Sequence, residues 1–148
     1  MQKKLKVKFF DKSVYPNGLQ MIGGKKSDWI DLRARETVEL YKDGFTLIPL
    51  GVAIQLPEGY EAIIAPRSST FKNYAVLQTN SIGIVDETYC GDNDEWKLPV
   101  FATEDMMIYK GERICQFRII EHQPELVIEY VDSLNNADRG GFGSTGTK

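Results

Sequence analysis

The segment GVAIQLPEGY, residues 51–60, shows the pattern that decides the fold. Val52, Ile54 and Leu56 share one parity, which is the period-two alternation of a strand with one buried face. The proline and glycine of LPEGY then signal a tight turn. Short apolar runs of this kind, separated by turn-forming residues, point to strands and not to long amphipathic helices.

The same pattern extends in both directions from this segment. KLKVKFF near the start of the chain alternates, and YKDGF and IYKGER each place a glycine-containing turn between apolar runs. In DWIDLRARETVEL, Thr37 and Val38, followed by Leu40 and Tyr41, fit a strand at least as well as a helix. Prolines recur often enough to disfavour long helices, at Pro49, Pro57, Pro66 and Pro99. The sequence therefore predicts an all-β, jelly-roll-like β-barrel with at most one short helix.

The composition is that of an ordinary globular chain, and it narrows the range of partners. At 148 residues the chain is most simply one domain. Its 18 basic and 21 acidic residues give a net charge of −3, so we expect no nucleic-acid polymer as partner. No apolar run has the length of a signal peptide or a membrane span, so we expect no membrane association and a cytoplasmic location. Cys90 and Cys115 form no CxxC pair, and we expect reduced thiols.

Two familiar kinds of catalytic site are disfavoured. His122 is the only histidine, so a zinc site or a Ser-His-Asp triad would have to be built around it. It lies in the polar stretch EHQPE, where we expect a solvated side chain. The segment GLQMIGGKKS, residues 18–27, comes near a phosphate-binding P-loop, but Gly24 stands where the pattern needs lysine. We therefore exclude a P-loop.

Two short motifs could bind an anion or a polar ligand. In PRSS, Arg67 precedes Ser68 and Ser69 where a short helix could begin, capped by one of the serines. Arg67 and the first N–H groups of that helix could form an anion site, and the alternative is a plain cap beside a surface arginine. In GERICQF, Gln116 lies in an apolar strand beside Phe117, so its amide needs either a ligand or a core hydrogen bond.

The stretch NSIGIVDETYCG, residues 80–91, combines an acid and an aromatic ring near a turn. Asp86 and Tyr89 lie three positions apart and are bracketed by Gly83 and Gly91. Apolar residues lead into them from the N-terminal side. We interpret the stretch as a glycine-hinged hairpin that carries both side chains at its tip.

The C-terminal residues differ in composition from the rest of the chain. Residues 135–148, NNADRGGFGSTGTK, contain no aliphatic side chain except Ala137, so alone they bury too little apolar area to offset their ordering entropy. A frayed terminus is one interpretation. Arg139 and Phe142 stand among glycines, which instead suggests a flexible lid that orders over a phosphate-bearing ring compound. Residues 1–134 would then form the β core.

Five motifs together resemble one known family. They are DLRA at residues 31–34, PRSS at 66–69, NSIGIVDETYCG at 80–91, GERICQ at 111–116 and RGGFGSTG at 139–146. With these motifs in this order, the chain resembles the homotrimeric dUTPases (dUTP diphosphatases) of Gram-positive bacteria and their phages. It departs from the usual form at Asp28, Trp29 and Ile30, which stand in place of a small residue, glycine and tyrosine. It also has two fewer residues between Arg139 and Phe142.

The resemblance implies hydrolysis of dUTP to dUMP and pyrophosphate, with a water attacking the α-phosphorus. Asp86 would hold the deoxyribose 3′-hydroxyl and orient or deprotonate that water. Tyr89 would pack against the sugar and exclude UTP by steric clash. The uracil edge would be read by Asn80 and by the chain at Gly83, Ile84 and Val85.

The resemblance also assigns the groups that would hold the triphosphate. The phosphates would contact Arg67, Ser68, Ser69 and Gln116. Mg²⁺ would be bound mainly by the triphosphate, with Asp31 acting through water. The lid would supply Arg139, Phe142, Gly143 and Ser144. Because family members combine motifs from three subunits in each site, the resemblance implies a homotrimer with shared active sites and dUTP as its small-molecule substrate.

Three alternatives remain beside this interpretation. The related dCTP deaminases share the fold, although residues 83–91 and the glycine-rich tail favour the diphosphatase. Some phage members also bind regulatory proteins, so a protein-binding module with a regulatory partner could use the same scaffold. A β-barrel with incidental motifs would require five motifs in order by chance.

Overall fold

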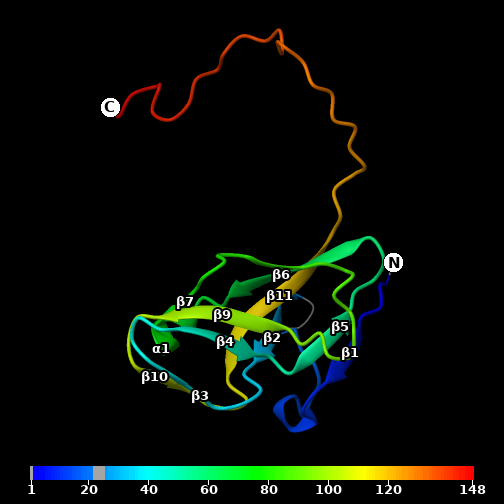
Figure 1. Ribbon diagram of the computed structural model, residues 1–148, viewed down its shortest axis with the longest axis vertical. Helices are drawn as coiled ribbons and strands as arrows, with labels where there is room; N and C mark the ends of the chain where they lie inside the picture. Colours follow the sequence, from blue (N-terminus) through cyan, green and yellow to red (C-terminus); the bar gives the residue numbers. More distant parts are fainter. Residues whose placement is uncertain (1, 22–25) are drawn as a thin grey trace.

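The computed structural model describes residues 2–21 and 26–148, and nearly all of its regular structure is β-strand (Figure 1). The largest sheet is antiparallel with the order β2-β11-β6-β8. Its strands are β2 (Ile30–Arg33), β11 (Arg113–Glu121), β6 (Tyr60–Pro66) and β8 (Gly83–Val85). The long strand β11 lies inside this sheet, so it fixes the positions of two neighbours at once.

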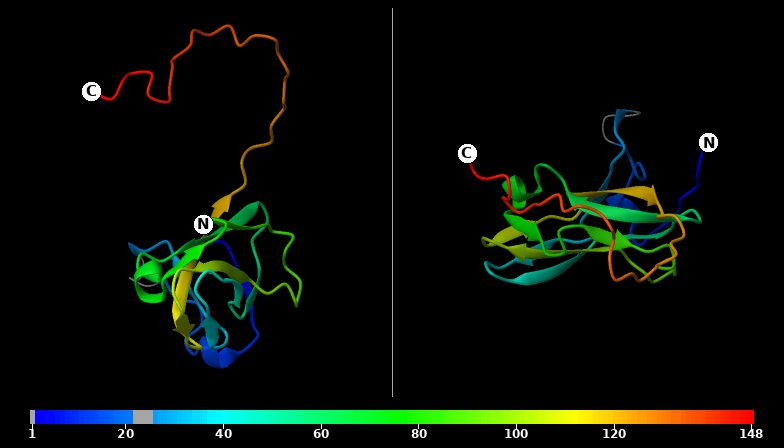
Figure 2. Two further views of the ribbon diagram at one scale, coloured as in Figure 1. Left: turned by 60° about the vertical axis from the view of Figure 1, so that its left-hand side comes forward. Right: turned by 90° about the horizontal axis from the view of Figure 1, so that it is seen from above.

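The remaining strands form three smaller antiparallel sheets. A three-stranded sheet has the order β4-β9-β7, and two strand pairs join β1 to β5 and β3 to β10. The bounds are β1 (Lys6–Phe9), β3 (Val38–Leu40), β4 (Phe45–Pro49), β5 (Val52–Gln55), β7 (Val76–Gln78), β9 (Lys97–Ala102) and β10 (Met106–Ile108). The sheets wrap around one core without closing into a continuous barrel (Figure 2). The predicted all-β, jelly-roll-like class is confirmed.

One apolar cluster fills the space between the sheets. The rings of Trp96 and Phe117 meet edge to face with centroids 5.1 Å apart, an arrangement that adds to the stabilisation from burial alone. Leu32 from β2 and Ile54 from β5 are also fully buried in this cluster. The residues of one parity in GVAIQLPEGY therefore face the core, as the alternation predicts.

A buried tyrosine joins the N-terminal segment to the sheets. Tyr15 follows a short 3-10 helix, η1 (Lys12–Val14), and its hydroxyl donates to Leu50 O at 2.7 Å and accepts from Arg33 N at 2.8 Å. Burial raises the pKa of Tyr15, so the hydroxyl keeps its proton and can serve as donor and acceptor together. It thereby fixes the end of β2, the strand that carries Asp31.

The predicted turns lie where the sequence places them. Gly59 and Gly111 both adopt positive φ, 83° and 88°, a region that glycine enters without steric cost. In YKDGF, Gly44 N donates to Tyr41 O at 2.9 Å. DWIDLRARETVEL forms β2 and β3, which confirms strand over helix. Residues 22–25 of the excluded P-loop segment lie outside the described part of the chain.

The predicted short helix is present, but its capping differs from the expectation. Helix α1 (Thr70–Tyr74) begins after Ser69, whose side chain makes no capping hydrogen bond. Ser69 has φ −97° and ψ −3°, whereas a capping side chain usually sits on extended backbone. Thr70 Oγ1 instead accepts from Arg67 N at 2.8 Å and donates to Ile114 O at 2.9 Å. The prediction of a capping serine was therefore wrong, and a buried threonine ties PRSS to β11.

The chain leaves the core at the end of β11. All residues from 121 to 148 are exposed, and the segment extends away from the sheets in Figure 1 and in the left view of Figure 2. Turns inside the glycine-rich part are local, such as the 3.0 Å bond from Ser144 N to Gly141 O. Within residues 2–21 and 26–148, no helix is long and apolar enough to cross a membrane.

Replacing Phe117 by alanine should lower the free energy of unfolding by about 3–5 kcal/mol, because a large buried ring is lost and a cavity remains. Urea unfolding at one fixed protein concentration measures the change. Phe142→Ala is the matched control, since this ring is fully exposed, and its effect should stay within about 0.5 kcal/mol. Equal losses in the two variants would contradict the assignment of the core.

Candidate active site

A cavity of about 360 Å³ lies beside strand β8 and the loop that follows it. Ile64, Ile84 and Val85 give it an apolar wall, and Asp86 and Tyr89 add an acid and a phenol. Residues 95–97, at the start of β9, complete the lining. A mainly apolar wall with a few polar groups is typical of a site for a small organic ligand. The structure thus brings together the predicted pair Asp86 and Tyr89.

The chain around this pair is a loop and not the predicted hairpin. Strand β8 pairs only with β6 among the described strands, and β9 begins at Lys97 in another sheet. The turn that ends β8 is closed by a hydrogen bond from Tyr89 N to Asp86 O at 3.0 Å. The hairpin prediction was wrong because this turn sends the chain to the three-stranded sheet. As an edge strand, β8 keeps one side of its backbone for other partners.

The Asp86 carboxylate is oriented by its own loop. Its Oδ1 accepts from both Thr88 N and Thr88 Oγ1, each at 2.8 Å. These two bonds, with a smaller contribution from the nearby His122, hold the pKa of Asp86 below its usual value. Asp86 is therefore a carboxylate at neutral pH. Thr88 was missed in the sequence, although an acid followed two residues later by threonine is a recognisable turn pattern.

The phenol of Tyr89 is held in place from the other side of the cavity. Its hydroxyl donates to Glu95 O at 3.1 Å. The Glu95 side chain is buried, accepts from Gly51 N at 2.9 Å and lies 3.1 Å from Arg35 Nε. A buried carboxylate with these partners fixes the backbone of its own segment. No local sequence pattern marks Glu95, because its partners Gly51 and Arg35 lie far away along the chain.

The two glycines allow close packing of this region. A Cβ on Gly83 would lie 3.1 Å from Ile64 Cβ, and one on Gly91 would lie 2.8 Å from Asp94 Oδ2. Neither glycine has a positive φ. The limited space for a Cβ, and not the backbone conformation, therefore favours glycine at these positions. Asn80 precedes β8 in an exposed turn, where its Oδ1 accepts from Gln78 Nε2 at 2.9 Å.

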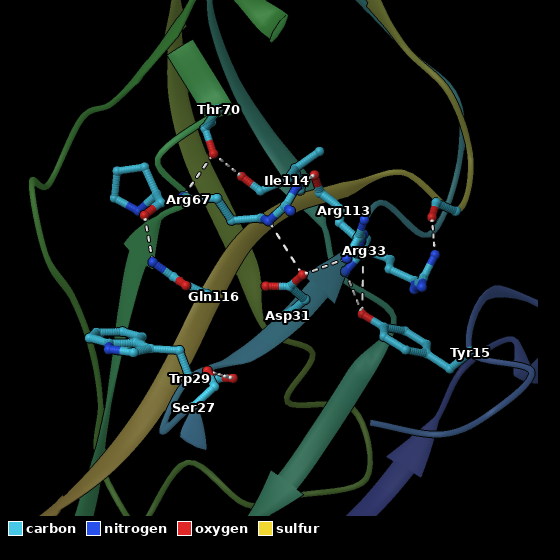
Figure 3. A network of polar contacts seen from close by, with 12 residues as sticks. Tyr15, Ser27, Trp29, Asp31, Arg33, Arg67, Thr70, Arg113, Ile114 and Gln116 are labelled. Atoms are coloured by element: carbon cyan, nitrogen blue, oxygen red, sulfur yellow. Dashed lines mark hydrogen bonds and ion pairs between the residues drawn. The ribbon is translucent and has the colours of Figure 1, made fainter. Parts of the chain in front are cut away.

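A second cavity of about 230 Å³ gathers four of the predicted site residues, Asp31, Arg67, Ser68 and Gln116, and three of them are labelled in Figure 3. It is lined by Ser27, Trp29, Asp31, Arg67, Ser68 and Gln116. Asp31 and Gln116 are paired across β2 and β11, and Gln116 is paired with Ala65 of β6. The amide of Gln116 donates to Pro66 O at 3.1 Å. Of the two partners that the sequence left open, a ligand or a hydrogen bond within the protein, the hydrogen bond is present.

A buried carboxylate organises the basic groups of this cavity. Asp31 is 9% exposed, and its Oδ2 lies 3.3 Å from Arg67 Nε and 3.2 Å from Arg113 Nη1 (Figure 3). Arg67 also donates to Arg113 O at 3.2 Å. Two guanidinium groups face one carboxylate, so the cluster keeps a net positive charge that suits a phosphate. Arg113 lies inside the GERICQ motif but was not among the predicted site residues.

A bulge in β11 explains how Arg113 reaches Asp31. The register against β2 shifts between Arg113 and Cys115, so Ile114 and Cys115 are both buried although they are consecutive. A bulge of this kind redirects the side chains beside it. Burial raises the pKa of the Cys115 thiol. Both cysteines are free, and Cys90 is exposed on the loop after Tyr89.

The two cavities share no lining residue, and the tail contributes to neither. Ser69 is at the start of α1 beside the second cavity. The remaining predicted residues, Arg139, Phe142, Gly143 and Ser144, lie in the exposed segment after β11. The single chain therefore presents the predicted site in three separate parts.

His122, the single histidine of the sequence, is exposed. Its Nδ1 lies 3.8 Å from Glu87 Oε1, and its side chain is 38% exposed. It borders the Asp86 loop. Among residues 2–21 and 26–148, no group of three or more His, Cys, Asp or Glu side chains is placed to hold a metal ion.

The fold is all-β, with one mainly apolar cavity that carries an acid and a phenol and a second cavity lined by charged and polar side chains. A family model described as dUTPase matches residues 25–146. A prophage-derived deoxyuridine 5′-triphosphate nucleotidohydrolase of Bacillus subtilis is 60% identical over 124 residues, which cover 84% of this chain and 87% of that protein. The chain therefore belongs to the dUTPase family, as its five motifs predicted.

Solved structures show the same fold. A mutant dUTPase of Staphylococcus bacteriophage 80alpha, described with dUpNHpp, superposes with a TM-score of 0.77 at 23% identity, covering 99% of this chain and 100% of that one. A mutant dUTPase from phage phi11 of S. aureus, described with a structural Mg(II) ion, gives 0.72 at 18% identity, with 90% and 99% covered. At these identities the likeness supports the fold alone.

Replacing Glu95 by alanine should destabilise the protein by about 1–3 kcal/mol, because Gly51 N–H would lose its buried acceptor. Glu95→Gln is the matched control: its amide oxygen can still accept from Gly51, so the loss should be smaller. Urea unfolding of the two variants and the wild type measures both effects. An alanine variant as stable as the wild type would contradict a structural role for this carboxylate.

Proposed function

We propose that this protein hydrolyses dUTP to dUMP and pyrophosphate, with a water attacking the α-phosphorus. The observation that carries the proposal is the placement of Asp86 and Tyr89 on one apolar cavity beside an edge strand. Asp86 accepts from the deoxyribose 3′-hydroxyl and orients the attacking water, a positioning role that suits a carboxylate already ionised at neutral pH. No covalent intermediate is required, and neither is a histidine.

The cavity fits a deoxyuridine. The backbone of Ile84 and Val85 at the free side of β8 can pair with the uracil edge as a further strand would. Asn80, just before this strand, adds a side-chain amide to that recognition. The ring of Tyr89 is 42% exposed and held by Glu95, so it forms a fixed wall against the sugar. A ribose 2′-hydroxyl would clash with that wall.

The second cavity is assigned to the phosphates. Arg67 and Arg113 supply the positive charge, and Ser68, Ser69 and Gln116 supply neutral hydrogen-bonding groups. Mg²⁺ bound by the triphosphate would neutralise charge that develops on the phosphate oxygens. The carboxylate of Asp31 is suited to contact the hydration shell of that ion, while its two arginine partners keep it in place.

We infer that the site is completed by a homotrimer. The β4-β9-β7 sheet leaves an apolar row at its surface, with Phe45 62%, Leu47 51% and Leu77 51% exposed. The segment after β11 is also apolar and exposed, at Leu126, Val127, Ile128, Tyr130, Val131 and Leu134. Exposed apolar surface of this extent is typical of an assembly interface. Neighbouring subunits can then bring the first cavity of one chain, which holds Asp86 and Tyr89, to the second cavity of another chain, which holds Asp31 and Arg67.

The tail is assigned to a lid that acts across subunits. Residues 135–148 lie outside the β core and are joined to it by the apolar segment from Leu126 to Leu134. If that segment packs on a neighbour, Arg139 and Phe142 are delivered to the neighbour's nucleotide. Closure would exclude water from the triphosphate, and Gly143 and Ser144 would approach it closely.

Pyrophosphate release should occur with dUTP and Mg²⁺ but not with UTP, dCTP or dTTP, and it should cease with EDTA. Asp86→Asn should lower kcat on dUTP by at least about a hundredfold, because the neutral amide neither orients the water as the carboxylate does nor accepts its proton as charge develops. A malachite-green assay after pyrophosphatase treatment measures both. Ammonia released from dCTP would favour the deaminase instead, and an inert wild type would favour a binding protein.

Mixed trimers test the shared site. Asp86→Asn and a deletion of residues 139–148 should each be nearly inactive alone. Co-expressed in equal amounts, they should recover about one quarter of wild-type activity if Asp86 and the tail come from different subunits. About half of the sites then receive an intact Asp86, and about half of those also receive an intact tail. Mixing the purified inactive trimers without exchange is the control. No recovery in co-purified mixed trimers would contradict sharing, and full activity of the deletion variant would contradict the lid.

A further inference from the structure

The Asp86 carboxylate has two oxygens in different surroundings. Oδ1 accepts two hydrogen bonds, from the backbone N–H and the hydroxyl of Thr88, both at 2.8 Å. Within the described residues, no hydrogen bond of the protein ends on Oδ2. Asp86 is exposed, and an exposed side chain held at only one oxygen has one fixed and one available acceptor.

We propose that Thr88 is a positioning residue that fixes Asp86 Oδ1 and thereby presents Oδ2 to the sugar hydroxyl and the attacking water. The inference rests on the proposed hydrolysis of dUTP. It assigns a role within that site to a residue that does not itself touch the reacting atoms. A carboxylate free to rotate would spend part of its time with neither oxygen correctly aimed, and misplacement by about 1 Å can already be costly in rate.

The hydroxyl of Thr88 contributes separately from its backbone. The N–H bond persists with any residue except proline at position 88, because it belongs to the turn that also joins Tyr89 N to Asp86 O. The hydroxyl adds a second donor to the same oxygen, and two donors on one oxygen define the plane of the carboxylate better than one. Thr88 is exposed, so its side chain can be changed with little effect on the core.

Other charged groups surround the carboxylate and must be separated from the effect of Thr88. Glu61 of β6 and His122 at the end of β11 line a surface depression together with Asp86. The adjacent Glu87 accepts from Gly59 N at 3.0 Å. Glu95 and Lys97 line the same 360 Å³ cavity as Asp86. Substitutions at position 88 leave all of these groups in place. A change in kcat or in the pKa of Asp86 can then be attributed to the missing hydroxyl of Thr88.

The matched variants are Thr88→Val, which keeps the size and the backbone N–H, and Thr88→Ser, which keeps the hydroxyl. Thr88→Val should lower kcat on dUTP about three- to tenfold while KM changes less than twofold, because alignment and not ground-state binding is lost. Thr88→Ser should stay near the wild type. Thermal unfolding of the three proteins should coincide.

The pH dependence gives a readout that a purely structural role would not move. Donors to the ionised form lower the pKa of a carboxyl group, so activity that requires ionised Asp86 extends to lower pH in the wild type. Thr88→Val should shift the acid limb of kcat/KM to higher pH, and Thr88→Ser should restore it. The ¹³C titration of the Asp86 carboxyl by NMR should shift in the same direction without any substrate.

Three results would overturn the inference. They are an unchanged kcat and acid limb in an active Thr88→Val enzyme, a Thr88→Ser enzyme as impaired as Thr88→Val, and an Asp86 titration that does not differ between the variants. If the wild type fails to hydrolyse dUTP, the proposed function fails and takes this inference with it. The wild-type assay therefore separates the two failures.

Discussion

Strand β11 connects the hydrophobic core to the basic cavity, and the rest of the structure depends on it. It pairs with β2 on one side and β6 on the other, while Ile114, Cys115 and Phe117 fill the core beneath. Its bulge lets two consecutive residues be buried, and so directs Arg113 toward Asp31. Core packing and the charge of the cavity are therefore set by the same few residues, which also explains why a motif with a strongly apolar pattern carries polar groups.

Much of the fold could be predicted from the sequence, because strands and turns leave local signals. The alternation through Val52, Ile54 and Leu56 is such a signal, and the glycine turn at Gly59 is another. From spacing alone, residues that share a cavity were predictable only where they are neighbours in sequence, as Asp86 and Tyr89 are. Asp31, Arg67 and Gln116, which share the second cavity, were grouped only by the resemblance to the family. Glu95 and Arg113 act through partners about 40 to 80 positions away. No periodic pattern in the sequence reveals such long-range contacts. The hairpin expected at Asp86 failed for the same reason, since the partner of β8 is decided by the sheet.

The exposed segment after β11 gives the clearest physical reason to think in terms of several chains. Leu126, Val127 and Ile128 are at least 60% exposed in one chain, and leaving such side chains in water forgoes the main driving force of folding. The glycine-rich residues beyond them carry only Ala137 and Phe142 as apolar side chains, too little to supply it. In the proposed function, this apolar segment anchors the tail on a neighbouring subunit, and the glycines beyond it allow the tail to close over the nucleotide and to reopen.

The environment of Asp86 decides which kind of catalyst the site can be. Hydrogen bonds that stabilise a carboxylate also weaken it as a base, since they lower the pKa of the group. A weakly basic, well-aimed carboxylate contributes by holding water and hydroxyl groups in the reactive geometry, and proton removal becomes favourable only as charge develops on the attacking water. In the proposed function, stabilising that charge falls to the second cavity, where two arginines face one buried acid. Since the two cavities of one chain share no lining residue, that function requires neighbouring chains to bring the two sets of groups together.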